Sequence, residues 1–140
     1  MKRWICYTLA VGLLFGAGIT TAQEAQQEQA VIGVAEQWLA LVDAGNYAQS
    51  WRESAASFRN AVSEDSWEQS LKAVRDPLGQ LLSREVLNAR FTTSLPGAPD
   101  GEYVVIQFRT SFENKKSAVE TVTPMREKDG RWRVSGYYIR

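Results

Sequence analysis

The sequence contains no histidine, and its one cysteine, Cys6, lies close to the N-terminus. Without histidine, the chain cannot build a Ser-His-Asp or Cys-His arrangement, a histidine general base or most kinds of zinc site. Neither a glycine-rich phosphate loop ahead of a helix nor the spaced carboxylates of a calcium loop is present. We therefore expect no metal and no cofactor, and we assign no catalytic residue.

An excess of charge of one sign is missing as well. The chain has 16 basic and 16 acidic residues, and the basic count falls to 14 if Lys2 and Arg3 are removed with a signal peptide. A near-neutral chain lacks the positive charge that a nucleic-acid-binding protein needs. We expect the partner to be a small apolar molecule or a protein, and not a nucleic acid.

The N-terminus has the pattern of a cleavable signal peptide. Two positive residues precede an uncharged apolar run from Ile5 to Ile19, and the small residues Thr20-Thr21-Ala22 follow it. We predict a signal peptide at 1–22 and a periplasmic or secreted protein that has no membrane segment after cleavage. The alternative is a retained anchor, although a spanning helix needs roughly 20 apolar residues and this run is shorter.

The rest of the chain is predicted to be a polar leader at 23–29 and one domain at 30–140. From Val31 onward the apolar residues recur at helical spacing. Gly45 ends the first predicted helix, Asn46 and Ser63 are the expected N-caps of the next two, and Pro77 and Gly79 stop the third. The pattern thus predicts three helices, at about 31–44, 46–62 and 63–76.

After Gly79 the apolar residues alternate with polar ones, as in strands. Four strands are predicted, at about 87–95, 103–112, 118–127 and 131–138. Pro124 indicates an edge position or a bulge, and Asp129-Gly130 predicts a hairpin. The expected fold class is α+β, with three N-terminal helices packed on one face of a four-stranded antiparallel meander.

Several motifs resemble known families. The turn Asp43-Ala44-Gly45-Asn46-Tyr47 and the ending Gly130–Tyr137 resemble parts of the cone-shaped NTF2-like fold, which is close to the cystatin-like fold. Two further segments, Ser94–Tyr103 and Ala118–Thr123, are similar to domain-of-unknown-function family 4019, small exported proteins of Gram-negative bacteria. The resemblance implies export and a reduced NTF2-like or cystatin-like cone, and it supplies no activity.

The mature chain is rich in aromatic residues, which allow two interpretations. They form either an apolar ligand pocket between helices and sheet or an ordinary core, in which each ring buries about 150–250 Å2. Trp132 is expected to face the helices. The candidate pocket-lining residues are Trp38, Trp51, Phe58, Phe108, Trp132 and Tyr138.

Asp43 lies in the last turn of the first predicted helix, where the helix dipole disfavours an anion by about 0.3–1 kcal/mol. Some NTF2-like enzymes use a carboxylate and a tyrosine in the cone, so Asp43 is a candidate base. The other interpretation is structural, with Asp43 bonded to backbone groups of the Gly45 turn. On that interpretation, replacing Asp43 by Asn changes stability by about 1 kcal/mol or less.

Charged residues also occur on the predicted strands. Arg90, Arg109, Arg131 and Arg133, with Glu102 and Glu120 nearby, form either a basic face that docks an acidic partner or a solvated face with cross-strand ion pairs.

Taken together, these patterns favour a non-catalytic binding module for a small apolar molecule or a protein partner. The first alternative is a carboxylate-dependent isomerase or hydrolase that uses Asp43 and a cone tyrosine. The second is a structural domain that forms a homodimer through the open sheet face.

Overall fold

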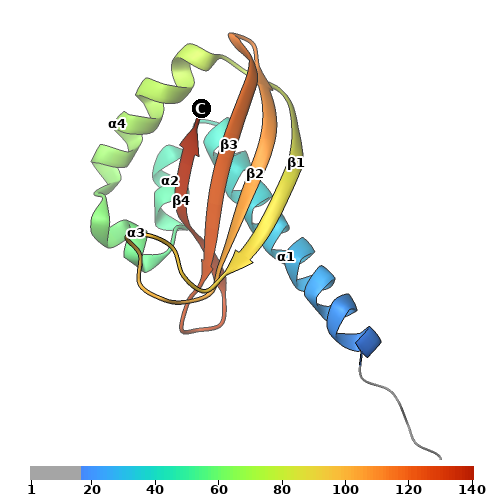
Figure 1. Ribbon diagram of the computed structural model, residues 1–140. Coiled ribbons are helices and arrows are strands. Elements are labelled where there is room, and N and C mark those ends of the chain that lie inside the picture. The colour runs from blue at the N-terminus through green and yellow to red at the C-terminus, as the bar shows by residue number, and fades with distance from the viewer. Residues whose placement is uncertain (1–16) are drawn as a thin grey trace, which may run out of the picture.

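The computed structural model describes residues 17–140, so most of the predicted signal peptide lies outside the described residues. Helices come first and a four-stranded antiparallel sheet follows (Figure 1), which confirms the predicted α+β class. The elements are α1 (Ala17–Asp43), α2 (Tyr47–Arg52), α3 (Ala56–Ala61), α4 (Glu64–Arg75), the 3-10 helix η1 (Asp76–Leu78), β1 (Leu81–Thr92), β2 (Tyr103–Phe112), β3 (Lys115–Arg126) and β4 (Trp132–Ile139).

The helix α1 has two different halves. Residues 21–30, which include the predicted polar leader, are helical and exposed, and this half of α1 projects beyond the sheet (Figure 1). From Val31 on, one side of the helix is buried, because Val31, Ala35, Leu39 and Val42 recur on one face. No helix among the described residues has the length and apolar character needed to cross a membrane.

The second predicted helix is divided into α2 and α3, so the prediction of one continuous helix is wrong. The break lies at Ser54 and Ala55, both fully buried. The backbone N–H of Ala55 donates to the carbonyl oxygen of Val134 in β4 at 2.8 Å, and this tertiary bond replaces a helical one. Asn46 makes no side-chain capping bond, whereas Ser63 caps α4 as predicted by accepting from the N–H of Ser66.

The strands follow one another in the order β1-β2-β3-β4, so β1 and β4 are the edges. The helix α1 crosses one face of this sheet and contacts all four strands. The core lies in this layer, between the buried side of α1 and inward residues such as Ile106, Phe108, Val122 and Val134. The hairpin predicted at Asp129-Gly130 joins β3 to β4, and Gly130 adopts a φ of 82° there.

Bulges change which residues face the helices. Between the pairs Thr123–Gly136 and Pro124–Val134, β4 contributes one extra residue. The extra residue shifts the alternation by one, so Tyr137 and not Tyr138 joins Val134 on the helix side. Pro124 therefore lies at a bulge, which is one of the two positions predicted for it. It does not occupy the other, an edge strand, because β3 is internal.

Candidate functional site

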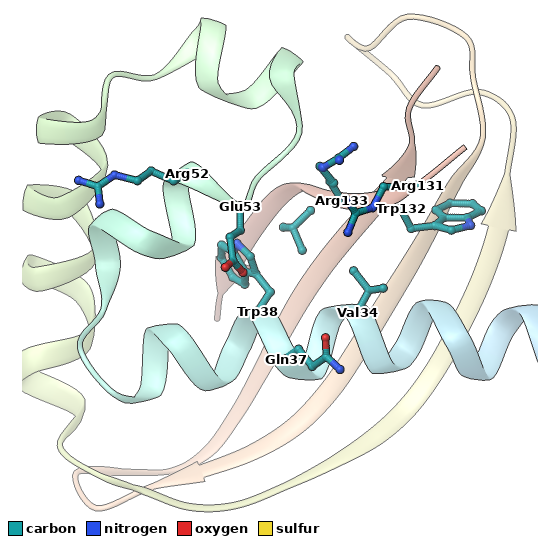
Figure 2. A pocket seen from close by; sticks show the side chains of 9 residues that line it. Val34, Gln37, Trp38, Arg52, Glu53, Arg131, Trp132 and Arg133 are labelled. Atoms are coloured by element: carbon teal, nitrogen blue, oxygen red, sulfur yellow. The ribbon is translucent and has the colours of Figure 1, made fainter. Parts of the chain in front are cut away.

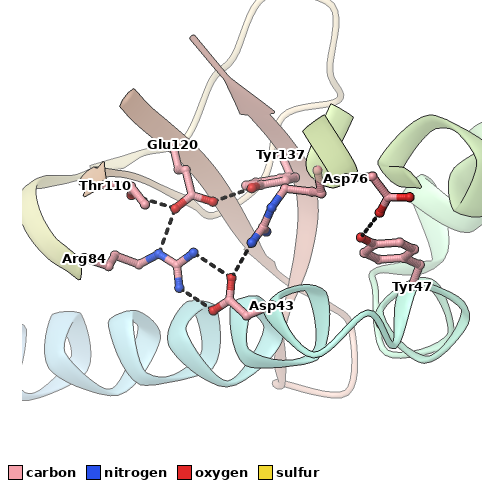
Figure 3. A network of polar contacts seen from close by, with 8 residues as sticks. Asp43, Tyr47, Asp76, Arg84, Thr110, Glu120 and Tyr137 are labelled. Atoms are coloured by element: carbon pink, nitrogen blue, oxygen red, sulfur yellow. Dashed lines mark hydrogen bonds and ion pairs between the residues drawn. The ribbon is translucent and has the colours of Figure 1, made fainter. Parts of the chain in front are cut away.

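The most concentrated group of charges surrounds Asp43 at the C-terminal end of α1 (Figure 3). Arg84 of β1 donates from Nη1 to Oδ2 of Asp43 at 2.6 Å and from Nη2 to Oδ1 at 2.9 Å. Arg75 of α4 donates from Nη2 to Oδ1 at 2.7 Å. Both oxygens of Asp43 are therefore occupied by guanidinium groups.

Arg84 extends this cluster to Glu120, which is 0% exposed. The Nε of Arg84 and the hydroxyl of Thr110 donate to Oε1 of Glu120 at 2.7 and 2.6 Å. The hydroxyl of Tyr137 donates to Oε2 in a short hydrogen bond. We call the six residues Asp43, Arg75, Arg84, Thr110, Glu120 and Tyr137 the buried network; its two cations balance its two anions.

The register of the sheet explains why these side chains meet. Arg84 pairs with Thr110, and Glu120 is placed between Ala118 and Val122 in the inward phase of β3. Paired residues of an antiparallel sheet share a face, so all of them point toward the helices.

The network shifts the proton affinities of its members. Burial opposes the charge of Asp43, but hydrogen bonds and charges from Arg84 and Arg75 outweigh it and hold the pKa of Asp43 below its usual value. Burial, with the charge of Glu120, raises the pKa of Tyr137 far above its usual range. Asp43 is thus ionised and Tyr137 is a neutral donor near pH 7.

Arg75 is the least satisfied member. Its side chain is 5% exposed, and its guanidinium lies 4.8 Å from the ring centre of Phe112. Its Nε and Nη1 are buried and have no hydrogen-bond partner among the described residues. The aromatic face of Phe112 offsets part of that cost by a cation–π contact.

Two expectations from the sequence are wrong here. Asp43 was expected to bond the backbone of the Gly45 turn, but its partners are the side chains of Arg75 and Arg84. Glu120 was expected beside solvated arginines, but it is buried because β3 is internal and position 120 faces the helices. Arg109, in contrast, forms the exposed cross-strand pair expected of it, with Glu85 at 2.9 Å.

The aromatic candidates are distributed over three environments. Trp38 and Phe108 are buried, and Trp51 and Phe58 pack against the same core. Trp132 is partly buried and also packs against this core, as predicted. Tyr138 is 55% exposed on the face of the sheet away from the helices, so it does not join the others.

The rings around Trp38 pack directly on one another. Its centroid lies 5.2 Å from that of Tyr137 and 6.1 Å from that of Trp67, which in turn meets Phe58 edge-on at 4.8 Å. The indole nitrogen of Trp38 donates to the carbonyl oxygen of Ser50 at 2.9 Å. Satisfied donors and close ring contacts are typical of a packed core.

Two surface hollows lie between α1 and the sheet, and Trp132 lines both. The first, the arginine hollow, has a volume of about 400 Å3 and its polar wall includes Arg52, Glu53, Arg131 and Arg133. Figure 2 shows Val34, Gln37 and Trp38 of α1 on one side of it and the start of β4 on the other. Two of its four charged residues are in ion pairs, since Arg52 binds Glu64 and Arg133 binds Glu127 and Asp129.

The second, the glutamate hollow, has a volume of about 420 Å3 and lies beside the exposed half of α1. Val31, Phe91, Val104 and Trp132 supply apolar walls, and Glu24, Gln27, Glu28 and Glu102 supply polar ones. Phe91 is 55% exposed. This hollow was not predicted from the sequence, because its residues come from a segment predicted as a leader, from the start of the first helix and from the ends of three strands.

A model of the family described as "Protein of unknown function (DUF4019)" matches residues 34–137. The matched range contains the whole buried network and the arginine hollow, whereas Glu24, Gln27, Glu28 and Val31 of the glutamate hollow precede it. No curated protein matches the chain.

Proposed function

The chain belongs to the DUF4019 family, and we propose that its domain is a non-catalytic binding module that holds a small apolar molecule in the glutamate hollow. The observation that carries the proposal is the pair Phe91 and Trp132, large rings that remain partly exposed in a concave site. Covering such surface is favourable by about 25 cal/mol per Å2. A volume near 420 Å3 is within the range of small-molecule sites.

The buried network supports a binding role over a catalytic one. The alternative, an isomerase or hydrolase that uses Asp43 and a cone tyrosine, needs a carboxylate that can reach a substrate proton. Here Asp43 is held by two arginines, and Tyr137 donates to Glu120 instead of facing Asp43. The arrangement fits a structural clamp that joins α1, α4 and the sheet.

The proposal is tested by native mass spectrometry of the protein purified from its own cells, followed by titration of any ligand found. We expect a bound apolar small molecule that Trp132→Ala releases. Tyr138→Ala is the matched control, because Tyr138 is an exposed aromatic residue on the opposite face. Retention of the ligand by Trp132→Ala, or its loss only in Tyr138→Ala, would place the site elsewhere.

We further propose that the protein is exported, to the periplasm of a Gram-negative cell or beyond it, and has a reduced NTF2-like or cystatin-like cone. Lys2, Arg3, the apolar run to Ile19 and Thr20-Thr21-Ala22 support export. The curved sheet that lies against α1 (Figure 1) supports the cone. N-terminal sequencing of the exported protein should give Gln23, and a sequence that begins at Met1 would contradict the signal peptide.

A protein partner or a second copy is the other candidate, favoured by the apolar surface near the edge strand β1. Four large exposed apolar residues belong to β1, namely Leu82, Val86, Leu87 and Phe91, and Tyr138 is exposed on the open sheet face. Sedimentation equilibrium tests this candidate. A dimer that Leu87→Glu or Tyr138→Glu dissociates would support it, and a monomer at all concentrations would leave the small-molecule site as the better account.

A further inference from the structure

We infer that the molecule held in the glutamate hollow is an organic cation, with a positively charged group attached to an apolar body. This inference rests on the proposed function and adds the charge of the ligand to it. The structural basis is the placement of three carboxylates, two of them unpaired, around an aromatic floor.

The first wall of the hollow carries unbalanced negative charge. Glu24 and Glu28 are four residues apart on α1 and therefore lie on one face of the helix. Like charges at this spacing repel, and neither carboxylate has an ion-pair partner among the described residues. No Lys or Arg side chain of the helix compensates them, since none occurs from Ala17 to Asp43. In a chain that begins at Gln23, the N-terminal amine would be the one positive group of this helix.

The opposite wall is also acidic. Glu102 lines the hollow from the end of the β1–β2 connection, and Arg126, its ion-pair partner among the described residues, lies 3.4 Å away in an exposed pair. Within residues 17–140, no basic residue lines this hollow, whereas three arginines line the neighbouring one. A cation placed between Glu28 and Glu102 would thus be attracted from both sides, and an anion repelled.

The floor of the hollow suits the same ligand. Trp132 and Phe91 present aromatic surface, and a cation within about 6 Å of an aromatic ring is attracted to its face. Val31 and Val104 lie beneath this floor and are 0% and 4% exposed, so an uncharged body would rest mainly on the two rings. A bare metal ion does not fit this description, because no group of three or more potential metal ligands gathers among the described residues.

The experiment compares three probes with the same apolar body: octyltrimethylammonium, 1-octanol and octanoate, each below its micelle concentration. Binding to the full domain is measured by calorimetry at low and high salt. We expect the cation to bind at least about tenfold more tightly than the alcohol, and octanoate to bind most weakly. The preference for the cation should shrink at high salt.

The double variant Glu24→Gln/Glu28→Gln should remove the preference and keep the binding of octanol. Glu36→Gln is the matched control, because Glu36 is an exposed carboxylate of α1 that does not line the hollow. Equal, Trp132-dependent binding of cation and alcohol would overturn the inference and leave the proposed function standing. If none of the three probes binds, the proposed site fails and the inference with it.

Discussion

Asp43 and Glu28 are carboxylates of the same helix, yet their surroundings differ completely. Asp43 binds Arg75 and Arg84 inside the buried network and shares Arg84 with Glu120, and the charges there balance. Glu28 borders a hollow without a cation and stays at the surface. A carboxylate can leave water only with partners that replace its hydration, and the partners at the Asp43 end come from α4 and β1.

From this comparison we expect the removal of Arg84 to cause the largest loss in the free energy of unfolding. Arg84→Met leaves Glu120 and Asp43 without their shared cation, and loss of one member of a buried ion pair costs about 3–5 kcal/mol. Arg109→Met is the matched control on the neighbouring strand, where the pair with Glu85 is exposed and is worth less than about 1 kcal/mol. Urea unfolding measures both, and equal losses would show that burial of the network has no energetic consequence.

Substitution of Trp38 in α1 and of Trp132 in β4 compares the stability that a ring contributes in the core and in the hollows. Trp38→Ala removes a buried ring and two hydrogen bonds, and we expect a loss of about 3–5 kcal/mol. Trp132→Ala should cost less, about 1–2 kcal/mol, because solvent already reaches the ring in both hollows. A larger loss for Trp132 in thermal or urea melts would mean that it belongs to the core.

Asp43→Asn should destabilise the protein by about 2–3 kcal/mol at pH 7, since charged hydrogen bonds of this kind contribute about 1.5–3 kcal/mol. This exceeds the value of about 1 kcal/mol or less that a turn role would give. The pKa of Asp43 is lowered from 3.8 in the folded state, so the unfolded chain binds the proton more tightly. The contribution of this carboxylate to the free energy of unfolding is fully present above pH 3.8 and is lost as the pH falls further. The difference in free energy of unfolding between wild type and Asp43→Asn should therefore become smaller in acid.

The smallest change in stability is expected for a substitution of Glu28. Glu28→Gln removes repulsion from Glu24 and should stabilise the protein by about 0.2–0.5 kcal/mol at low salt. The gain should vanish at high salt, because exposed charges are screened. A loss of stability would reveal a cation that already balances these carboxylates.

Local patterns were enough to predict much of the fold. The cap at Ser63, the stop at Pro77 and Gly79, and the hairpin at Asp129-Gly130 all depend on neighbouring residues, and the structure contains each of them. The division of α2 from α3 depends on a bond between Ala55 and Val134, which no local pattern reveals.

The buried network was missed for a related reason. A charged residue on a strand is usually solvated, so Glu120 was assigned to the surface although Ala118 and Val122 share its phase. That phase was the available signal. No comparable signal in the sequence indicates that Tyr137 points inward, because the bulge in β4 that turns it is a property of the assembled sheet.

The strand β4 completes both the core and the buried network. Its residues supply Val134 to the core and Tyr137 to Glu120, and the backbone of Arg140 exchanges two hydrogen bonds with Val119. A nascent chain that lacks this strand exposes the underside of α1 and leaves Glu120 with fewer donors. Truncation of β4 should therefore yield a chain that cannot complete its core and that proteases degrade.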